Sequence, residues 1–217
     1  MTRKTIRIAT ALVGAMFIVT AMVGTATASD GLSSRLARVK AATSEFRSLG
    51  EATEDGYGLP PAGVPLHECI SSFDGSGAMG FHYINGSLLD ATISANHPEA
   101  LVYAPDARGR LHLAALEYVV FQDAWKAKHG NTMPKLFGQM FMATGSPNRY
   151  NIPAFFSLHV WLFQPNPSGM FAPFNPNVSC GGATASTTNA IAAVAASSHL
   201  AAGATNLYSC QVPTRRT

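Results

Sequence analysis

The central part of the chain alternates apolar and polar residues with a period of two. In 79–84, large apolar side chains alternate with His82, and the run ends at Asn85-Gly86, a strong turn signal. Residues 155–163 form a second run rich in aromatic and aliphatic side chains. Both patterns predict β-strands, because successive side chains of a strand point to opposite faces.

Two further runs predict a β-hairpin. Residues 101–104 are apolar, the turn sequence Pro-Asp-Ala-Arg-Gly follows at 105–109, and 110–121 is a long run of β-type residues. We expect 101–104 to pair with 110–121. A short helix is predicted to follow over 121–129, because Lys and His lie in its last turn and Gly130 comes directly after it.

A helical period precedes these strands. Between residues 32 and 49, apolar side chains recur every three or four positions, which predicts an amphipathic helix with Gly50 as its stop. Residues 56–65 are rich in Gly and Pro and predict a connector. The expected fold is therefore α+β, with an N-terminal helix packed on a mainly antiparallel sheet that curls toward a barrel.

The N-terminus has the features of a signal peptide. Positive charges lie at Arg3, Lys4 and Arg7. No charge follows until Asp30, and Ala26-Thr27-Ala28 fits the small-x-small cleavage rule. We predict that 1–28 is removed and that the protein is secreted or held in the cell envelope without a stable membrane anchor. The alternative is an uncleaved anchor, because the uncharged run is long enough to cross a bilayer.

Cleavage also changes the charge of the protein. The chain has 15 Lys and Arg against 12 Asp and Glu, and three of the basic residues belong to 1–28. The mature chain is therefore neutral in formal charge, and its 12% charged residues are few for a globular domain. This balance gives no reason to expect nucleic acid as a partner.

The mature chain divides into three parts by composition. Residues 29–65 hold the helix and the connector, and 66–180 predict one β-rich globular domain. Residues 181–217 are dominated by Ala, Gly, Ser and Thr, which offer little apolar area to bury, so we expect a weakly packed tail.

Three cysteines, Cys69, Cys180 and Cys210, allow one disulfide in an oxidising compartment. Closing the loop from Cys69 to Cys180 restricts the unfolded chain by up to about 4.7 kcal/mol, against somewhat over 3 kcal/mol for Cys180 to Cys210. The energies do not decide between the two. Position favours Cys69–Cys180, because these residues bracket the β-rich part.

Three polar residues lie inside the apolar runs: His82, Glu117 and His159. By the two-residue period, Glu117 shares a face with its apolar neighbours Leu111, Leu113, Ala115, Val119 and Phe121. His159 shares a face with Phe155, Trp161 and Phe163. A carboxylate is costly to bury unless it is paired or bound to metal, and two histidines with one carboxylate are a ligand set for a divalent ion such as zinc or non-haem iron.

A proline-rich loop, 165–176, follows the last predicted strand and carries several large apolar side chains. Such side chains either pack on the sheet or line a binding mouth. We therefore predict a pocket between this loop and the His/Glu face. The expected ligand-binding residues are His82, Glu117, His159, Trp161, Met170 and Phe171.

Other interpretations of these residues stay open. Glu117 and His159 fit a carboxylate-oriented base, or Glu117 pairs with an arginine such as Arg110 or Arg149 in a purely structural network. The spacing of the three residues matches no metal signature. The sequence also lacks a Gly-x-Ser-x-Gly elbow, a His-Glu-x-x-His motif, a phosphate loop and a dinucleotide fingerprint.

Several segments together resemble a family of exported bacterial proteins of unknown function that is common in actinobacteria. The segments are 79–85 (MGFHYIN), 98–103 (PEALVY), 116–118 (LEY), 158–161 (LHVW) and 175–180 (NPNVSC). The resemblance covers roughly 66–180. It implies one exported domain that ends at Cys180 and a second cysteine near Cys69. It implies no catalytic residue, and the tail with Cys210 departs from the family pattern.

The sequence thus supports three hypotheses of function. The first is a module that binds a metal or small ligand in the His/Glu pocket. The second is an extracytoplasmic hydrolase that uses His159 with Glu117. The third is a structural protein of the envelope or a surface-interaction protein.

Overall fold

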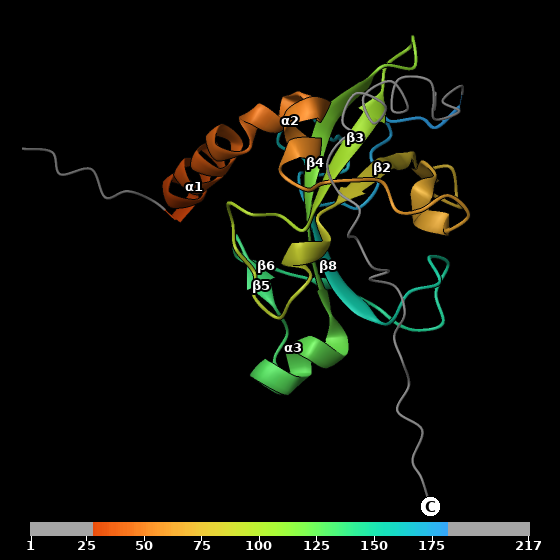
Figure 1. The fold of residues 1–217 in the computed structure, drawn as a ribbon. Helices are drawn as coiled ribbons and strands as arrows, with labels where there is room; N and C mark the ends of the chain where they lie inside the picture. Colours follow the sequence, from red (N-terminus) through yellow and green to blue (C-terminus); the bar gives the residue numbers. More distant parts are fainter. Residues whose placement is uncertain (1–27, 182–217) are drawn as a thin grey trace, which may run out of the picture.

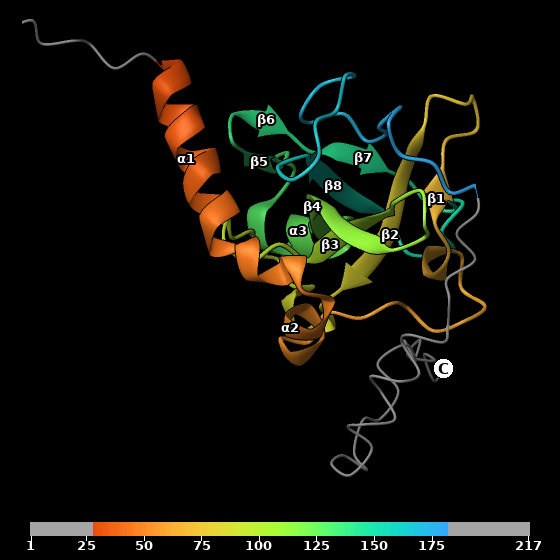
Figure 2. The same cartoon turned by 90° about the horizontal axis from the view of Figure 1, so that it is seen from above.

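The computed structural model describes residues 28–181, and a six-stranded antiparallel sheet forms its centre (Figure 1). The strands lie in the order β1-β2-β3-β4-β8-β7, and β5 and β6 form a separate pair. Their bounds are β1 (Ile70–Ser71), β2 (Ala78–Ile84), β3 (Ala100–Pro105), β4 (Leu111–Phe121), β5 (Lys135–Leu136), β6 (Gln139–Met140), β7 (Met142–Thr144) and β8 (Phe155–Val160). The large sheet curls like half of a barrel (Figure 2). The mixed α+β class is confirmed.

The helical elements are short, apart from the first. They are α1 (Ala28–Ala42), η1 (Ser44–Arg47), α2 (Leu49–Glu54), η2 (Pro65–His67), η3 (Gly86–Leu88) and α3 (Gln122–His129). The single helix predicted over 32–49 is therefore wrong in extent. The hydroxyl of Thr43 bonds back to the carbonyl of Val39 at 2.8 Å, and Ser48 caps a new helix by accepting from the amide of Glu51. Gly50 lies inside α2 and does not end the helix.

The hairpin and the short helix after it are confirmed. Strand β3 pairs with β4 in antiparallel register, and α3 ends at His129 with Gly130 as its C-cap. The Asn85-Gly86 turn is different from expectation. Asn85 caps η3 by accepting from the amide of Ser87 at 3.1 Å, and the chain then makes a long connection to β3. A side chain that caps the next turn replaces the tight hairpin that these residues usually form.

A β-bulge in β4 decides which residues face which side of the sheet. Val102 is opposite Ala115 and Tyr103 is opposite Leu113, so Ala114 is an extra residue. The carbonyl of Ala114 accepts from the amides of Phe163 and Gln164, both at 3.1 Å.

The predicted set of residues that share a face with Glu117 is partly wrong, and the bulge is the reason. Leu113 is buried in the main core cluster, Leu111 packs against that cluster, and Leu116, Tyr118 and Val120 belong to it from beyond the bulge. Glu117 lies on the opposite face. The extra residue shifts the two-residue period, so Leu111 and Leu113 do not share the face of Glu117.

The main core lies on one face of the sheet. Val39 and Phe46 are buried in the same cluster as Leu101 and Leu158. Three buried tyrosines reach out of this cluster with their hydroxyl groups. The bonds run from Tyr57 to the carbonyl of Pro98, from Tyr103 to that of Phe46 and from Tyr118 to that of Ala95. Each of these three phenols is thus paired, which avoids the cost of an unpaired buried polar group.

The Cys69–Cys180 disulfide is present, with 5.6 Å between the two Cα atoms. The predicted pairing is therefore confirmed. The predicted signal peptide and the Ala-rich tail with Cys210 lie outside the described residues. Within 28–181, no helix combines the length and the apolar character that a bilayer crossing requires.

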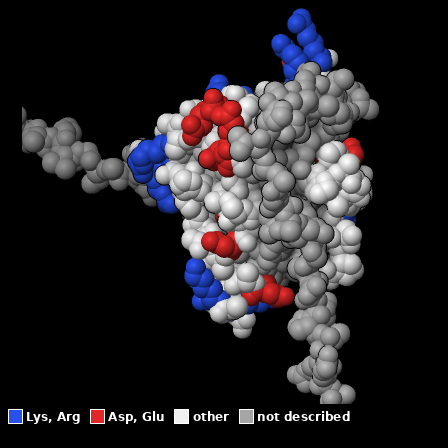
Figure 3. All heavy atoms as spheres, viewed as in Figure 1, with Lys and Arg blue, Asp and Glu red and all other residues white. Residues whose placement is uncertain are grey.

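Charged side chains are sparse on the face seen in Figure 3. Acidic and basic groups lie there in small separate clusters, with wide uncharged surface between them. The described part of this face has no continuous basic surface. The prediction that nucleic acid is not a partner remains a prediction.

Gly80 on β2 provides a test of the sheet packing. Its φ is +114°, and an added Cβ would lie 2.5 Å from the carbonyl oxygen of Tyr103 on β3. Gly80→Ala is therefore expected to lower the free energy of unfolding by about 3 kcal/mol, through backbone strain and overlap. Gly109→Ala is the control, because Gly109 has φ +75° and no neighbour within 4 Å of an added Cβ. Urea unfolding measures both, and equal losses would mean that the close approach of β2 and β3 is not tight.

Candidate metal centre

The sheet brings the three predicted polar residues to one point. His82 comes from β2, Glu117 from β4 and His159 from β8. Glu117 and His159 are direct partners across the two neighbouring strands. Strand β3 separates β2 from β4, and its Ala100 is opposite both Ile84 and Glu117. The methyl side chain of Ala100 leaves room for His82 to reach Glu117.

The three side chains are in mutual contact. Nε2 of His82 lies 3.2 Å from Oε2 of Glu117, and Nδ1 of His159 lies 3.5 Å from Oε1 of Glu117. The Nε2 atoms of the two histidines are 3.4 Å apart, and their rings are nearly perpendicular, at 89°. His82 and His159 are each 2% exposed and Glu117 is 7% exposed. This group is therefore removed from bulk water.

The hypothesis that Glu117 pairs with an arginine is wrong. Arg110 pairs with Asp106 at 2.8 Å in the β3–β4 turn. Arg149 stacks over the ring of Phe73 at 3.9 Å and donates to the carbonyl of Ser71. Both arginines are held in loops, so the histidines are the partners of Glu117.

The charges of the group depend on one another. Burial tends to raise the pKa of Glu117, but the two histidines and the Ser157 hydroxyl outweigh it and hold this pKa well below the usual range. Burial lowers the pKa of His159, although Glu117 opposes that effect. A buried carboxylate needs a compensating positive charge, which a protonated histidine of the group or a bound cation would provide.

The geometry is close to that of a metal centre. One ligand atom from each of His82, Glu117 and His159 can be chosen so that all three lie within 4.8 Å of one another. Zinc bonds to nitrogen and oxygen of about 2.0–2.2 Å place tetrahedral ligands roughly 3.3–3.6 Å apart. Nε2 of His82 is already near this range, at 3.2 Å from Oε2 of Glu117 and 3.4 Å from Nε2 of His159. A shift of roughly 1 Å at Glu117 or His159 completes the set.

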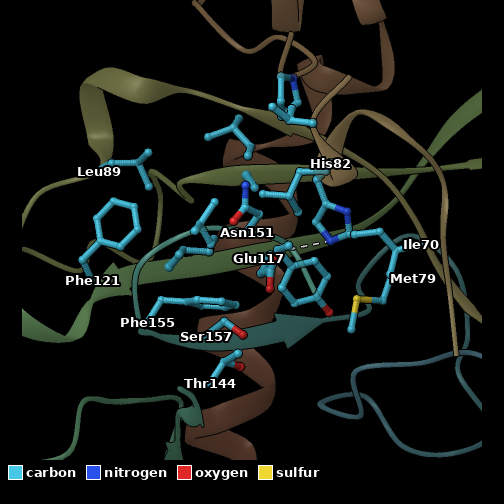
Figure 4. Close-up of a pocket in the computed structure, with 18 of the residues that line it drawn as sticks. Ile70, Met79, His82, Leu89, Glu117, Phe121, Thr144, Asn151, Phe155 and Ser157 are labelled. Carbon is cyan, nitrogen blue, oxygen red and sulfur yellow. Dashed lines mark ion pairs between the residues drawn. The ribbon is translucent and has the colours of Figure 1, made fainter. Parts of the chain in front are cut away.

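A cavity of about 480 Å³ lies on one side of the group, and His82 and Glu117 are part of its wall (Figure 4). Its other walls come from the sheet, from the 60–66 connector and from the 150–152 loop. They are mostly apolar: Pro60, Pro61, Val64, Leu66, Ile70, Met79, Ile84, Leu89, Ala100, Val119, Phe121, Met142, Tyr150, Ile152 and Phe155, with Thr144, Asn151 and Ser157 as polar members.

We call His82, Glu117 and His159 the triad. The other predicted ligand residues lie outside the cavity wall. Trp161 is buried beside His159, with ring centroids 6.4 Å apart, and donates to the carbonyl of Ala172 at 2.7 Å. Met170 is 41% exposed, and Phe171 packs against the main core cluster. Trp161, Met170 and Phe171 are absent from the cavity wall. Two carbonyls of the 165–176 loop accept from Trp161: that of Met170 from its amide at 2.9 Å and that of Ala172 from its indole. No residue of this loop lines the cavity, so its contact with a ligand stays a prediction.

Sequence reasoning missed most of the wall. Residues 56–65 were expected to be only a connector, yet Pro60, Pro61 and Val64 cover the cavity. The available signal was the apolar Val64 and Leu66 beside two prolines, since apolar side chains in a loop need a surface to cover. Ser157 was also detectable, because it precedes His159 by two residues and so shares its face.

A second buried carboxyl, Glu99, lies close to this face and predicts a pH effect. Burial raises the pKa of Glu99 to about 8, helped by Asp90 and Glu117 and opposed by the backbone amide of Val119, which donates to Oε2 at 3.0 Å. The folded protein thus holds a proton that the unfolded chain loses above pH 4.5. Stability should fall as the pH rises from 4.5 to about 8.

Glu99→Gln imitates the protonated side chain and is expected to remove this pH dependence. Relative to the variant, the wild type should lose on the order of 3 kcal/mol across that window. Urea unfolding at pH 5 and at pH 8.5 measures the difference. Parallel pH profiles for the two proteins would show that Glu99 is ionised in the fold.

Comparison with protein-family models, with curated proteins and with solved structures found no match for this chain. The fold and the triad define a class only: an α+β domain with a buried group of two histidines and one glutamate that can hold a metal ion. The function is therefore argued from the geometry of this site.

Proposed function

We propose that the protein is a binding module for a divalent transition-metal ion, held by His82, Glu117 and His159. One observation carries the proposal: three buried side chains with metal-ligating atoms come from three strands and lie within 4.8 Å of one another. A rigid sheet holds ligands in place better than loops do. Imidazole nitrogen with one carboxylate suits zinc and its neighbours among the first-row ions.

Three protein ligands leave one position of a tetrahedral ion open. His82 and Glu117 line the cavity, whereas His159 does not. The open position therefore faces the cavity. This arrangement supports binding over the hydrolase hypothesis, because His159 has no access to a substrate in the cavity and would be a poor general base there.

We also propose an extracytoplasmic location. The Cys69–Cys180 disulfide supports it, since such bonds persist in oxidising compartments. The predicted signal peptide and the resemblance to exported actinobacterial proteins point the same way and stay predictions. The hypothesis of a structural envelope protein is the alternative that the metal experiment tests.

Metal analysis and zinc titration test the proposal. The purified protein is freed of metal with a chelator and titrated with Zn²⁺ by calorimetry. We expect one ion per chain and a higher unfolding temperature of the zinc-loaded form, because a ligand that binds only the folded state stabilises it. His82→Ala should abolish the stoichiometric binding. His112→Ala is the matched control, since His112 lies outside the triad and contacts Gln164.

Two results would contradict the proposal. The first is zinc binding well below one ion per chain that reconstitution does not restore. The second is equal zinc binding by His82→Ala and the wild type. If His82→Ala changes only the unfolding temperature and no zinc binds to either protein, the triad is a structural network.

A further inference from the structure

The cavity beside the triad has a polar floor between apolar walls. Figure 4 shows His82, Glu117 and Ser157 near one another at the floor. Phe121 and Leu89 lie further along the cavity, and Ile70 and Met79 lie on its other side. A volume of about 480 Å³ is within the range of small-molecule sites, roughly 300–1,000 Å³. Its size and its apolar wall fit a small molecule with an apolar body.

The polar floor is accessible from the cavity side only. On the other side, Trp161 packs beside His159 together with Val102, Ala104 and Ala115 in a second buried cluster. A group that joins an ion in the triad therefore has to enter from the cavity. The open coordination position and the apolar wall would be used by the same molecule.

We propose that this molecule is an amphipathic monocarboxylate, whose carboxylate completes the metal coordination and whose apolar tail fills the cavity. The inference rests on the proposed metal site. It goes beyond that site by naming the chemical class of the ligand and by assigning the wall residues a role in binding.

Charge balance selects the head group. A divalent ion with one glutamate and two neutral imidazoles carries a net charge of about +1 in a buried place, which a single anion neutralises. Among the wall residues, Glu117 is the only side chain that carries a formal charge at neutral pH, and the metal would use it. The remainder of the wall offers no cation to a second anionic group. One carboxylate therefore fits, and a dianion does not.

The remaining wall of the cavity indicates the chemistry of the ligand's tail. Aliphatic, aromatic and proline side chains dominate it, from the sheet below and from the 60–66 connector above. Thr144, Asn151 and the phenol hydroxyl of Tyr150 are its polar groups in addition to the floor residues. Burying a hydrocarbon chain here contributes about 0.8 kcal/mol for each methylene group removed from water. Affinity should therefore rise with chain length until the cavity is full.

Calorimetry with decanoate and decanol tests the inference. The two molecules share an apolar tail and differ in the head group. With zinc-loaded protein, decanoate should bind at least about tenfold more tightly than decanol, a difference of about 1.4 kcal/mol. With metal-free protein the preference should disappear or reverse, because Glu117 then repels an anion. Zinc stoichiometry is measured in the same samples.

Two methionines provide matched variants for the wall. Met142 lies on β7 and lines the cavity, whereas Met140 lies on β6 and does not; they are 47% and 62% exposed. Met142→Glu should weaken decanoate binding to zinc-loaded protein at least about fivefold, because a charge is placed beside the tail. Met140→Glu should leave it unchanged. Zinc stoichiometry is measured for both variants, so that a loss of decanoate binding is separated from a loss of zinc.

The outcomes separate the two proposals. Stoichiometric zinc with equal affinity for decanoate and decanol, or with no binding of either, overturns the carboxylate inference and leaves the metal site standing. Equal effects of the Met142 and Met140 variants overturn the assignment of the cavity to the tail. Absence of stoichiometric zinc overturns both proposals, whatever binds in the cavity.

Discussion

Replacing Glu117 by glutamine is expected to weaken zinc binding by about a hundredfold or more. The amide has nearly the same shape as the carboxylate, but it carries no negative charge and is a poorer metal ligand. Removing a hydrogen-bond partner of a metal ligand already lowers metal affinity by about 10–100-fold. Loss of a ligand itself should therefore lower it by at least the upper value. Competition with a chromogenic zinc chelator measures the change.

Glu99→Gln is the matched control for this variant. Both glutamates are buried, Glu99 at 1% and Glu117 at 7% exposed, but Glu99 directly precedes β3, accepts from the amide of Val119 and pairs with neither histidine. Its replacement should leave zinc affinity within about twofold of the wild type. If the two variants lose equal affinity, zinc is held by some other part of the protein.

Removing the disulfide should have the largest effect on stability. The bond between Cys69 and Cys180 closes a loop of 111 residues. By the chain-entropy relation, a loop of this length restricts the unfolded state by about 4–5 kcal/mol. The double variant Cys69→Ser, Cys180→Ser is expected to lose that much in urea unfolding. The bond also fixes the start of β1, next to Ile70 in the cavity wall, so ligand binding should weaken as well.

Cys210→Ser is the control, because Cys210 is not part of this bond. Its unfolding curve should overlay that of the wild type. A large loss in the Cys210 variant, with little change in the double variant, would show that the native pairing in solution is different.

The sequence predicts the strands well where the pattern is local. The alternation around His82 and the turn at 105–109 depend on neighbours a few residues apart, and both elements form as expected. The meeting of His82, Glu117 and His159 was also predictable, because each lies on an otherwise apolar strand. The identity of their partners was open, since strand order decides it and a sequence pattern does not specify strand order.

Other parts could not be predicted for physical reasons. The bulge at Ala114 depends on the path of Phe163 and Gln164, some fifty residues later in the chain, whose amides bond to its carbonyl. The 60–66 connector covers the cavity through tertiary contacts that its Gly- and Pro-rich composition does not encode. The helix of 32–49 breaks because Thr43 and Ser48 compete for backbone groups, which an apolar period does not register.

The extra residue at Ala114 gives β4 one residue more than its pairing with β3 requires. Deleting Ala114 would leave Leu113 opposite Tyr103 and Ala115 opposite Val102, so Glu117 would keep its place opposite Ala100 and beside the histidines. Such a deletion would instead remove the carbonyl that accepts from the amides of Phe163 and Gln164. Related sequences that share the centre are therefore expected to tolerate the loss of one residue at this point, together with the loss of this link to the 163–164 segment.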